Sequence, residues 1–178
     1  MMPRLTALIA AAVVAGCVAS APPGEPPPDA LRLLPAEPAA SVLYVALGDS
    51  TVEGVGASSP AHNYVGRLHE RLRAVYPRAR LMNLGVGGAT ASGVRSRQLP
   101  RALELQPDLV TLSVGPNDIT GKRDLESYAR DIDAILLTLT RRTSAVVVVN
   151  LIPDLTVTPR FRGKGDRAGR PPARGRLQ

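Results

Sequence analysis

The chain is poor in the residue types that mark several protein classes. Its 178 residues include no Trp, one Phe, one Cys and two His. A lone cysteine excludes an internal disulfide framework, and so few Cys and His residues leave no cluster with metal-ligand spacing. The scarcity of aromatic residues removes the stacking groups that nucleic-acid-binding grooves use. With 44% hydrophobic residues, the chain instead predicts one globular domain with a core rich in Ala, Val and Leu.

The formal charge of +7 is concentrated at the carboxyl end of the chain. From residue 160 onward there are seven basic residues and one acidic residue, a net +6 that leaves +1 for everything before it. A nearly neutral body does not support nucleic-acid binding. Residues 163–178 are rich in Arg, Gly and Pro and have no apolar periodicity. We interpret them either as the product of a frameshift or early stop, or as a genuine basic, disordered tail.

The amino terminus has the pattern of an export signal. Arg4 precedes a short apolar stretch, residues 5–15, which is too short to span a bilayer. The run Val-Ala-Gly-Cys that ends at Cys17 resembles the bacterial lipobox, in which the cysteine is acylated. We predict a signal peptide over residues 1–16, a lipid anchor on Cys17 and a location at the cell membrane or envelope. An ordinary cleavable signal, and hence a secreted protein, is the alternative.

A linker and one domain come after the signal. Residues 17–40 are rich in Pro and Ala and lack periodicity, which is typical of an extended spacer. Residues 41–162 alternate strand-like and helix-like patterns, and this alternation predicts a parallel sheet covered on both faces. Pro100 predicts a kink in the second helix, and the valine run at 146–149 predicts a strand buried on both faces. The predicted strands are 42–47, 80–84, 108–114 and 145–152, and the predicted helices are 63–75, 92–105 and 124–141.

Polar or glycine-rich turns follow the first three strands. They are Gly48-Asp49-Ser50, the segment 83–90 and the segment 115–118, which reads Gly-Pro-Asn-Asp. Because parallel strands end at the same edge of a sheet, we expect the three turns to lie together there. A serine in this position is a candidate nucleophile, and glycine N–H groups and an Asn side chain are candidate oxyanion donors. The alternative for Ser50 is a turn residue that caps the next segment.

These turns together resemble the SGNH hydrolases, the GDSL-type esterases and lipases. The resemblance implies that Ser50 is the nucleophile and that its own N–H, Gly88 and Asn117 form the oxyanion hole, with Gly85 and Gly87 as alternatives to Gly88. It implies a flavodoxin-like three-layer α/β/α sandwich with a parallel sheet, here without the last strand and helix. It also implies a monomer, when complete, that hydrolyses small-molecule or polymer-linked esters without a metal or cofactor.

The chain departs from this family in its catalytic base. The family supplies the base from a late Asp-x-x-His motif, and the 178 residues contain none. His62 and His69, the two histidines, lie in or just before the first predicted helix, where a packing or solvent-facing role is expected. We therefore expect this chain to be inactive as an esterase. The alternative function is a non-catalytic module that binds an acylated sugar or lipid at the cell envelope.

The lipid anchor can be tested directly. Expressed in a bacterium supplied with labelled palmitate, the protein should incorporate the label, because the lipobox cysteine is the acylation site. A Cys17→Ala variant should remain unlabelled. Equal labelling of the two proteins would contradict the anchor.

Overall fold

The structure, a computed structural model, describes residues 32–152. The predicted signal peptide at 1–16, Cys17 and the basic tail at 163–178 lie outside these residues, as does most of the predicted linker. The described residues form a parallel sheet of four strands in the order β2-β1-β3-β4. This is the flavodoxin-like order, and the predicted fold class is confirmed. The strands are β1 (Leu43–Gly48), β2 (Arg80–Asn83), β3 (Leu109–Ser113) and β4 (Val146–Val149).

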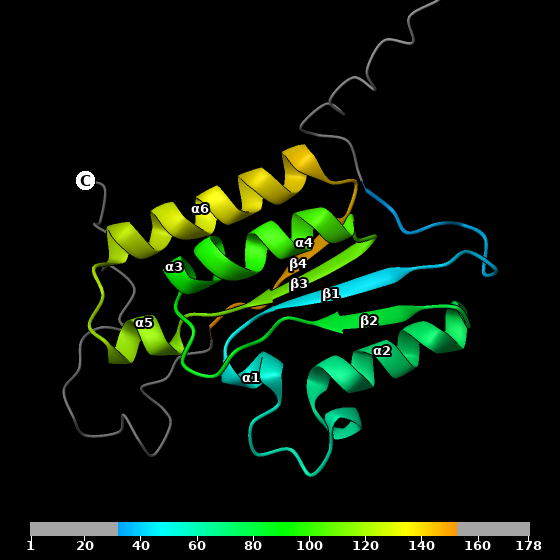
Figure 1. The fold of residues 1–178 in the computed structure, drawn as a ribbon, viewed down its shortest axis with the longest axis horizontal. Coiled ribbons are helices and arrows are strands. Elements are labelled where there is room, and N and C mark those ends of the chain that lie inside the picture. The colour runs from blue at the N-terminus through cyan, green and yellow to red at the C-terminus, as the bar shows by residue number, and fades with distance from the viewer. Residues whose placement is uncertain (1–31, 153–178) are drawn as a thin grey trace, which may run out of the picture.

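Helices cover both faces of the sheet, which gives the three layers seen in Figure 1. One face is covered by α2 (Tyr64–Val75), and the other by α3 (Ala91–Gly93), the π-helical segment η2 (Val94–Gln98), α4 (Leu99–Leu105) and α6 (Leu125–Arg142). Short helices follow some strand ends and loops: α1 (Ser50–Glu53), η1 (Pro60–His62) and α5 (Pro116–Thr120). None of the helices within residues 32–152 combines the length and the apolar character that a membrane crossing requires.

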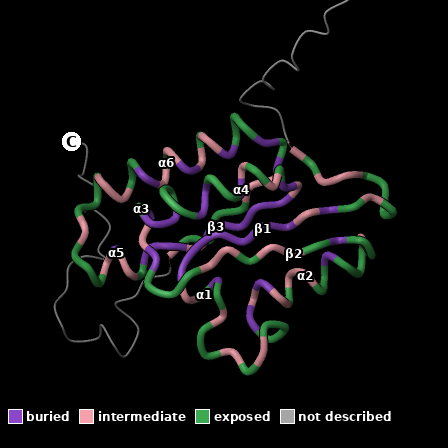
Figure 2. The backbone as a smooth tube through the Cα atoms, in the orientation of Figure 1, coloured by how far each residue is buried: buried purple, intermediate pink, exposed green. Residues whose placement is uncertain are grey.

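The central strand β1 packs against helices on both sides. Tyr44 and Ala46 belong to the core shared with α2, whereas Val45 and Leu47 belong to the core shared with α4 and α6. All four side chains are fully buried, and Figure 2 shows buried backbone along β1 and β3 between helices with exposed outer faces. Successive side chains of a strand point to opposite faces, so an unbroken apolar run is what a doubly covered strand requires.

Helix α2 begins and ends where the sequence predicts. The side chain of Asn63 caps it by accepting a hydrogen bond from the N–H of Gly66 at 2.7 Å. This bond satisfies one of the N–H groups that have no partner within the helix. Pro77 follows the last turn and cannot continue the helix.

The predicted helix at 92–105 is divided by a π-helical segment, Val94–Gln98, that ends two residues before Pro100. The N–H of Leu99 donates to the carbonyl of Val94, five residues earlier. Pro100 has no N–H to donate, and its ring clashes with the carbonyl four residues earlier in a regular α-helix. A wider turn immediately before the proline accommodates both effects. The extra residue of this turn places Gln98 in the interior, with 5% of its surface exposed.

Strand β4 differs from the prediction in length and burial. It covers four residues, and Val148 and Val149 are 44% and 38% exposed. Burial on both faces was the wrong prediction for this strand. Within residues 32–152, β4 pairs with β3 alone, and nothing described lies on its outer side. A valine run indicates a strand, but its burial depends on the neighbours of that strand.

Arg32, the first described residue, forms hydrogen bonds with the end of α6 and the segment that follows it. Its guanidinium donates hydrogen bonds to the carbonyl oxygens of Thr140, Thr143 and Ala145. The last carbonyls of a helix have no partner within the helix, and a cation there is also favoured by the helix dipole. The contact lies at the amino edge of the sheet, opposite the edge where the turns after β1, β2 and β3 lie.

The exposed edge strand generates a prediction about association. Without a lipid, the chain should self-associate at micromolar concentration, because β4 presents backbone groups and valines to a second strand. Replacing Val148 and Val149 with Lys should raise the monomer fraction in size-exclusion chromatography, since charged side chains oppose edge pairing.

A matched control replaces Leu125 and Leu137 together with Lys, which adds the same two charges at exposed positions of α6 and should not change the monomer fraction. A sharp monomer peak and cooperative thermal unfolding of the unmodified chain would contradict the expectation.

Candidate active site

Ser50 lies at the carboxyl end of β1, at the first position of α1. Asp49 is buried, and its carboxylate caps α1 by accepting a hydrogen bond from the N–H of Thr51 at 2.9 Å. Ser50 is half-buried, and no hydrogen bond of its Oγ is found among residues 32–152. The capping role that a turn residue would take is therefore filled by Asp49, which leaves the Ser50 hydroxyl available.

The glycine-rich loop after β2 lies beside Ser50. A Cβ atom added to Gly87 would lie 4.0 Å from the Cβ of Ser50. Two of the three glycines use their N–H groups within the protein: Gly85 donates to Asn83 Oδ1 at 2.9 Å, and Gly87 donates to Glu53 Oε2 at 2.7 Å.

Gly88 differs from the other two glycines of this loop. Among the described residues no acceptor is found for its N–H, and the same holds for the N–H of Ser50. Its φ is +77°, a conformation that favours glycine, and a Cβ added there would have no atom within 4 Å. Gly88 therefore has an open position and an N–H that is not engaged with residues 32–152.

Asn117 joins the turn after β3 to the glycine loop. The segment predicted as a turn forms the short helix α5, and Asn117 is its second residue. The Nδ2 of Asn117 donates one of its two hydrogens to the carbonyl of Ala89 at 2.9 Å. The three turns thus lie at one edge of the sheet, as the sequence predicts.

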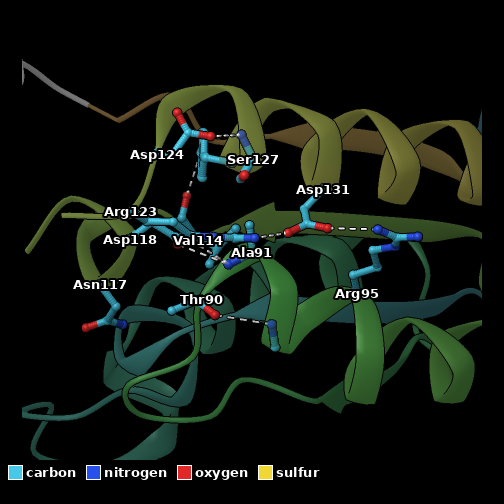
Figure 3. Close-up of polar contacts among 12 residues, drawn as sticks. Thr90, Ala91, Arg95, Val114, Asn117, Asp118, Arg123, Asp124, Ser127 and Asp131 are labelled. Carbon is cyan, nitrogen blue, oxygen red and sulfur yellow. Dashed lines mark hydrogen bonds and ion pairs between the residues drawn. The ribbon is translucent and has the colours of Figure 1, made fainter. Parts of the chain in front are cut away.

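Asp118 is a buried carboxylate that the sequence did not single out. Its two oxygens accept hydrogen bonds from the N–H of Ala91, the nearer at 3.0 Å, where α3 begins. Arg123 donates to the same carboxylate at 3.0 Å and also pairs with Asp131 on α6. Figure 3 shows these side chains converging, with the Asn117 carboxamide directed away from the ion pairs.

Asp131 completes this charged network. Arg95 of η2 donates to it at 3.0 Å, so the carboxylate has two guanidinium partners. Burial opposes ionisation of Asp131, but the hydrogen bonds from Arg123 and Arg95 outweigh it and lower its pKa. The hydrogen bonds that Arg123 donates to Asp131 and, to a lesser extent, to Asp118 raise the pKa of Arg123. The network ties the segments after β2 and β3 to α6.

The histidines are engaged away from Ser50. His62 Nδ1 lies 2.7 Å from Ser58 Oγ in an exposed loop, and His69 Nε2 lies 3.2 Å from the carbonyl of Ala79. His69 thus has the flank role that its place in the helix predicts. Within the described residues, neither histidine forms a hydrogen bond with Ser50.

A cavity of about 350 Å³ opens beside Ser50. Tyr64 lines this cavity, and its hydroxyl is buried without a hydrogen-bond partner among the described residues. Burial raises the pKa of this phenol. A cavity of this size is at the lower end of ligand-binding pockets. Its lining consists of Ser50, Thr51, Gly54, Val55, Ala57, Asn63 and Tyr64.

Comparisons with known proteins give one family and one fold. The model of the GDSL-like Lipase/Acylhydrolase family matches residues 46–177. Among solved structures, AlinE4, an SGNH-hydrolase family esterase, is 27% identical with a TM-score of 0.55, and the match covers 62% of this chain and 58% of that one. The chain therefore spans less than two thirds of that esterase. No curated protein sequence matches the chain.

Two further solved structures show the same fold. TesA is 22% identical, with a TM-score of 0.57 and coverage of 72% of this chain and 68% of that one. A two-domain esterase active on acetylated mannans is 24% identical, with a TM-score of 0.53 and coverage of 61% and 30% respectively.

The charged network predicts a pH-dependent contribution to stability. Asp131→Asn should lower the free energy of unfolding by about 1–3 kcal/mol at neutral pH, because hydrogen bonds from two guanidinium groups are weakened. The pKa of Asp131 is lower in the folded chain than its ordinary 3.8, so its stabilisation is complete above that value and is lost as the pH falls through the folded pKa. The difference between the two proteins in urea unfolding should shrink below about pH 4.

Asp133→Asn provides the control for this measurement. Asp133 is exposed on the same helix, and its substitution should change stability by less than about 0.5 kcal/mol. An Asp131→Asn deficit of the same size in acid and at neutral pH would contradict the role of the charge.

Proposed function

Because the chain belongs to the GDSL-like lipase/acylhydrolase family, we propose that its domain is built for the hydrolysis of carboxylic esters through an acyl-enzyme at Ser50. The supporting observation is the pattern of unengaged groups at one edge of the sheet. The hydroxyl and N–H of Ser50 and the N–H of Gly88 have no partner among the described residues, and Asn117 retains a second amide hydrogen beyond the one bonded to Ala89. These are the groups that attack on an ester requires.

In the proposed reaction, Ser50 Oγ forms a bond to the carbonyl carbon and the carbonyl oxygen takes up the electron pair as an oxyanion. The N–H groups of Ser50 and Gly88 and the Nδ2 of Asn117 donate to this oxyanion. Such donors are worth about 10²–10³-fold in rate for each one removed. Collapse then breaks the bond to the alcohol, which leaves with the proton that Ser50 Oγ gave up to a base during attack, and the acyl group remains on Oγ. Water subsequently releases the acid.

The proton of Ser50 needs an acceptor, and the sequence supplies no Asp-x-x-His motif for it. His62 and His69 form their hydrogen bonds elsewhere. An oxyanion hole and substrate binding alone retain only weak catalysis when the base is missing. We therefore propose that the 178-residue chain does not turn esters over by itself.

A second candidate is a binding module. The cavity beside Ser50 could hold the acyl or sugar part of an ester whether or not a bond is broken, and the missing base favours retention without cleavage. In either case the proposed ligand is a small-molecule or polymer-linked ester. The proposed location is the cell envelope, with export directed by residues 1–16 and a lipid on Cys17.

Chemical rescue separates the two candidates. The purified chain should hydrolyse p-nitrophenyl acetate no faster than a Ser50→Ala variant. With imidazole added as a free base, the unmodified chain should exceed the variant on the order of tenfold, since a general base contributes about 10²–10⁴-fold when it is well positioned. The background reaction of imidazole itself is the same in both samples and can be subtracted.

Equal rates with imidazole would contradict an acylating site and favour the binding module. Serine-dependent turnover without imidazole would contradict the absence of a base. It would show that some group of the chain accepts the Ser50 proton. A longer chain that encodes the Asp-x-x-His motif should hydrolyse the ester without imidazole.

A further inference from the structure

Gly48, the last residue of β1, has no partner in β2. The pairing of β1 with β2 ends at Ala46 and Asn83, two residues before Gly48. On that side Gly48 would have an N–H without a strand acceptor, although its carbonyl receives the N–H of Val86 at 3.1 Å. An orphaned N–H in the interior is costly, so a substitute partner is required.

Gln98 provides that partner with both ends of its carboxamide. Its Oε1 accepts the N–H of Gly48 at 2.8 Å, and its Nε2 donates to the carbonyl of Gly48 at 2.8 Å. Gln98 is 5% exposed. The side chain thus reproduces the pair of hydrogen bonds that a neighbouring strand would make, fifty residues away in the sequence.

The π-helical segment explains how Gln98 reaches the sheet. Gln98 is the last residue of η2 and precedes Leu99, whose N–H bonds five residues back to Val94. In a regular helix each residue advances by a fixed angle, and the added residue of a π turn changes the angle at which the neighbouring side chains project. A π turn therefore sets the direction in which the Gln98 carboxamide points.

Gly48 needs such a partner because its conformation is unusual. Its φ is +150°, and an added Cβ would lie 1.9 Å from the carbonyl oxygen of Ser113. Only glycine fits this close approach, and glycine is also the residue with the most conformational freedom to lose. A peptide of this kind remains in one orientation only if its surroundings hold it.

We propose that Gln98 is a positioning residue for Ser50: it fixes the Gly48 peptide and, through Asp49, the orientation of the Ser50 N–H and hydroxyl. This inference rests on the proposed function, in which Ser50 is the nucleophile. Gln98 does not touch the ester and acts only through the backbone two residues before Ser50. Its loss should therefore affect the rate of attack rather than substrate binding.

Gln98→Met tests the role of the two hydrogen bonds between Gln98 and Gly48, because methionine has a similar length and no hydrogen-bonding carboxamide. In hydrogen–deuterium exchange of the full chain, peptides that span Gly48 to Ser50 should exchange on the order of tenfold faster than in the unmodified protein. Peptides from α6 should be unchanged. A purely global loss of stability would instead accelerate exchange in α6 as well.

Two control variants accompany it. Gln106→Met makes the same substitution at an exposed helix end and should not alter exchange at Gly48. Ile135→Val weakens the core on α6 without touching Gly48, so it reports what a general destabilisation does. In imidazole-supported turnover of p-nitrophenyl acetate, Gln98→Met should lower kcat by about ten- to a hundredfold with KM unchanged.

Unchanged exchange at Gly48 would overturn the proposal that Gln98 fixes the Gly48 peptide. Faster exchange with unchanged kcat would show that Gln98 holds the strand end without positioning Ser50, and would overturn the proposal. A raised KM with unchanged kcat would also overturn it. If the unmodified chain shows no Ser50-dependent turnover in imidazole, the proposed function fails, and the exchange experiment still decides whether Gln98 fixes the segment that carries Ser50.

Discussion

The buried carboxylate of Asp118 is the group on which the geometry of the candidate site depends. A carboxylate removed from water must be both paired and hydrogen-bonded, or its burial is strongly unfavourable. Asp118 meets this requirement with the N–H of Ala91 and the guanidinium of Arg123, so the segments that follow two different strands share one group. Asn117 is adjacent to this bond along the chain and Gly88 is three residues from it. The spacing of two proposed oxyanion donors therefore follows from the compensation of a single charge.

The sequence predicts the frame of the fold because the frame depends on local patterns. An unbroken apolar run places β1 and helical periodicity places α2. The common edge of parallel strands places the turns that carry Ser50 and Asn117. The strand order came from the family resemblance. The roles of Gln98 and Asp118 could not be predicted, since Gln98 contacts a residue fifty positions away and Asp118 one that is 27 positions away. No periodicity or composition signals such long-range hydrogen bonds. The exposure of β4 could not be predicted for a related reason: the burial of a strand depends on the elements that pack beside it.

The three glycines of the loop after β2 differ in the hydrogen bonds of their N–H groups, a difference that the sequence does not show. The family resemblance implies Gly88 and leaves Gly85 and Gly87 as alternatives, and these two engage their N–H groups with Asn83 and Glu53. The contact with Glu53 also links the loop to α1, the helix that begins at Ser50. A glycine-rich loop is flexible by composition, and here two of its amides are used to order it. The third remains available for a ligand.

The bonds of Arg32 to the end of α6 have a mechanical consequence. Any tension transmitted through the preceding chain reaches the amino edge of the sheet first, where Arg32 divides the load between α6 and the start of β1. Pulling along β1 would have to shear its hydrogen bonds to β2 and β3 together, which is a resistant geometry compared with peeling them one at a time. The turns that carry Ser50 and Gly88 lie at the far end of those strands. If the proposed lipid on Cys17 holds the domain at its amino terminus, the candidate site lies at the end of the strands opposite the point where that tension enters.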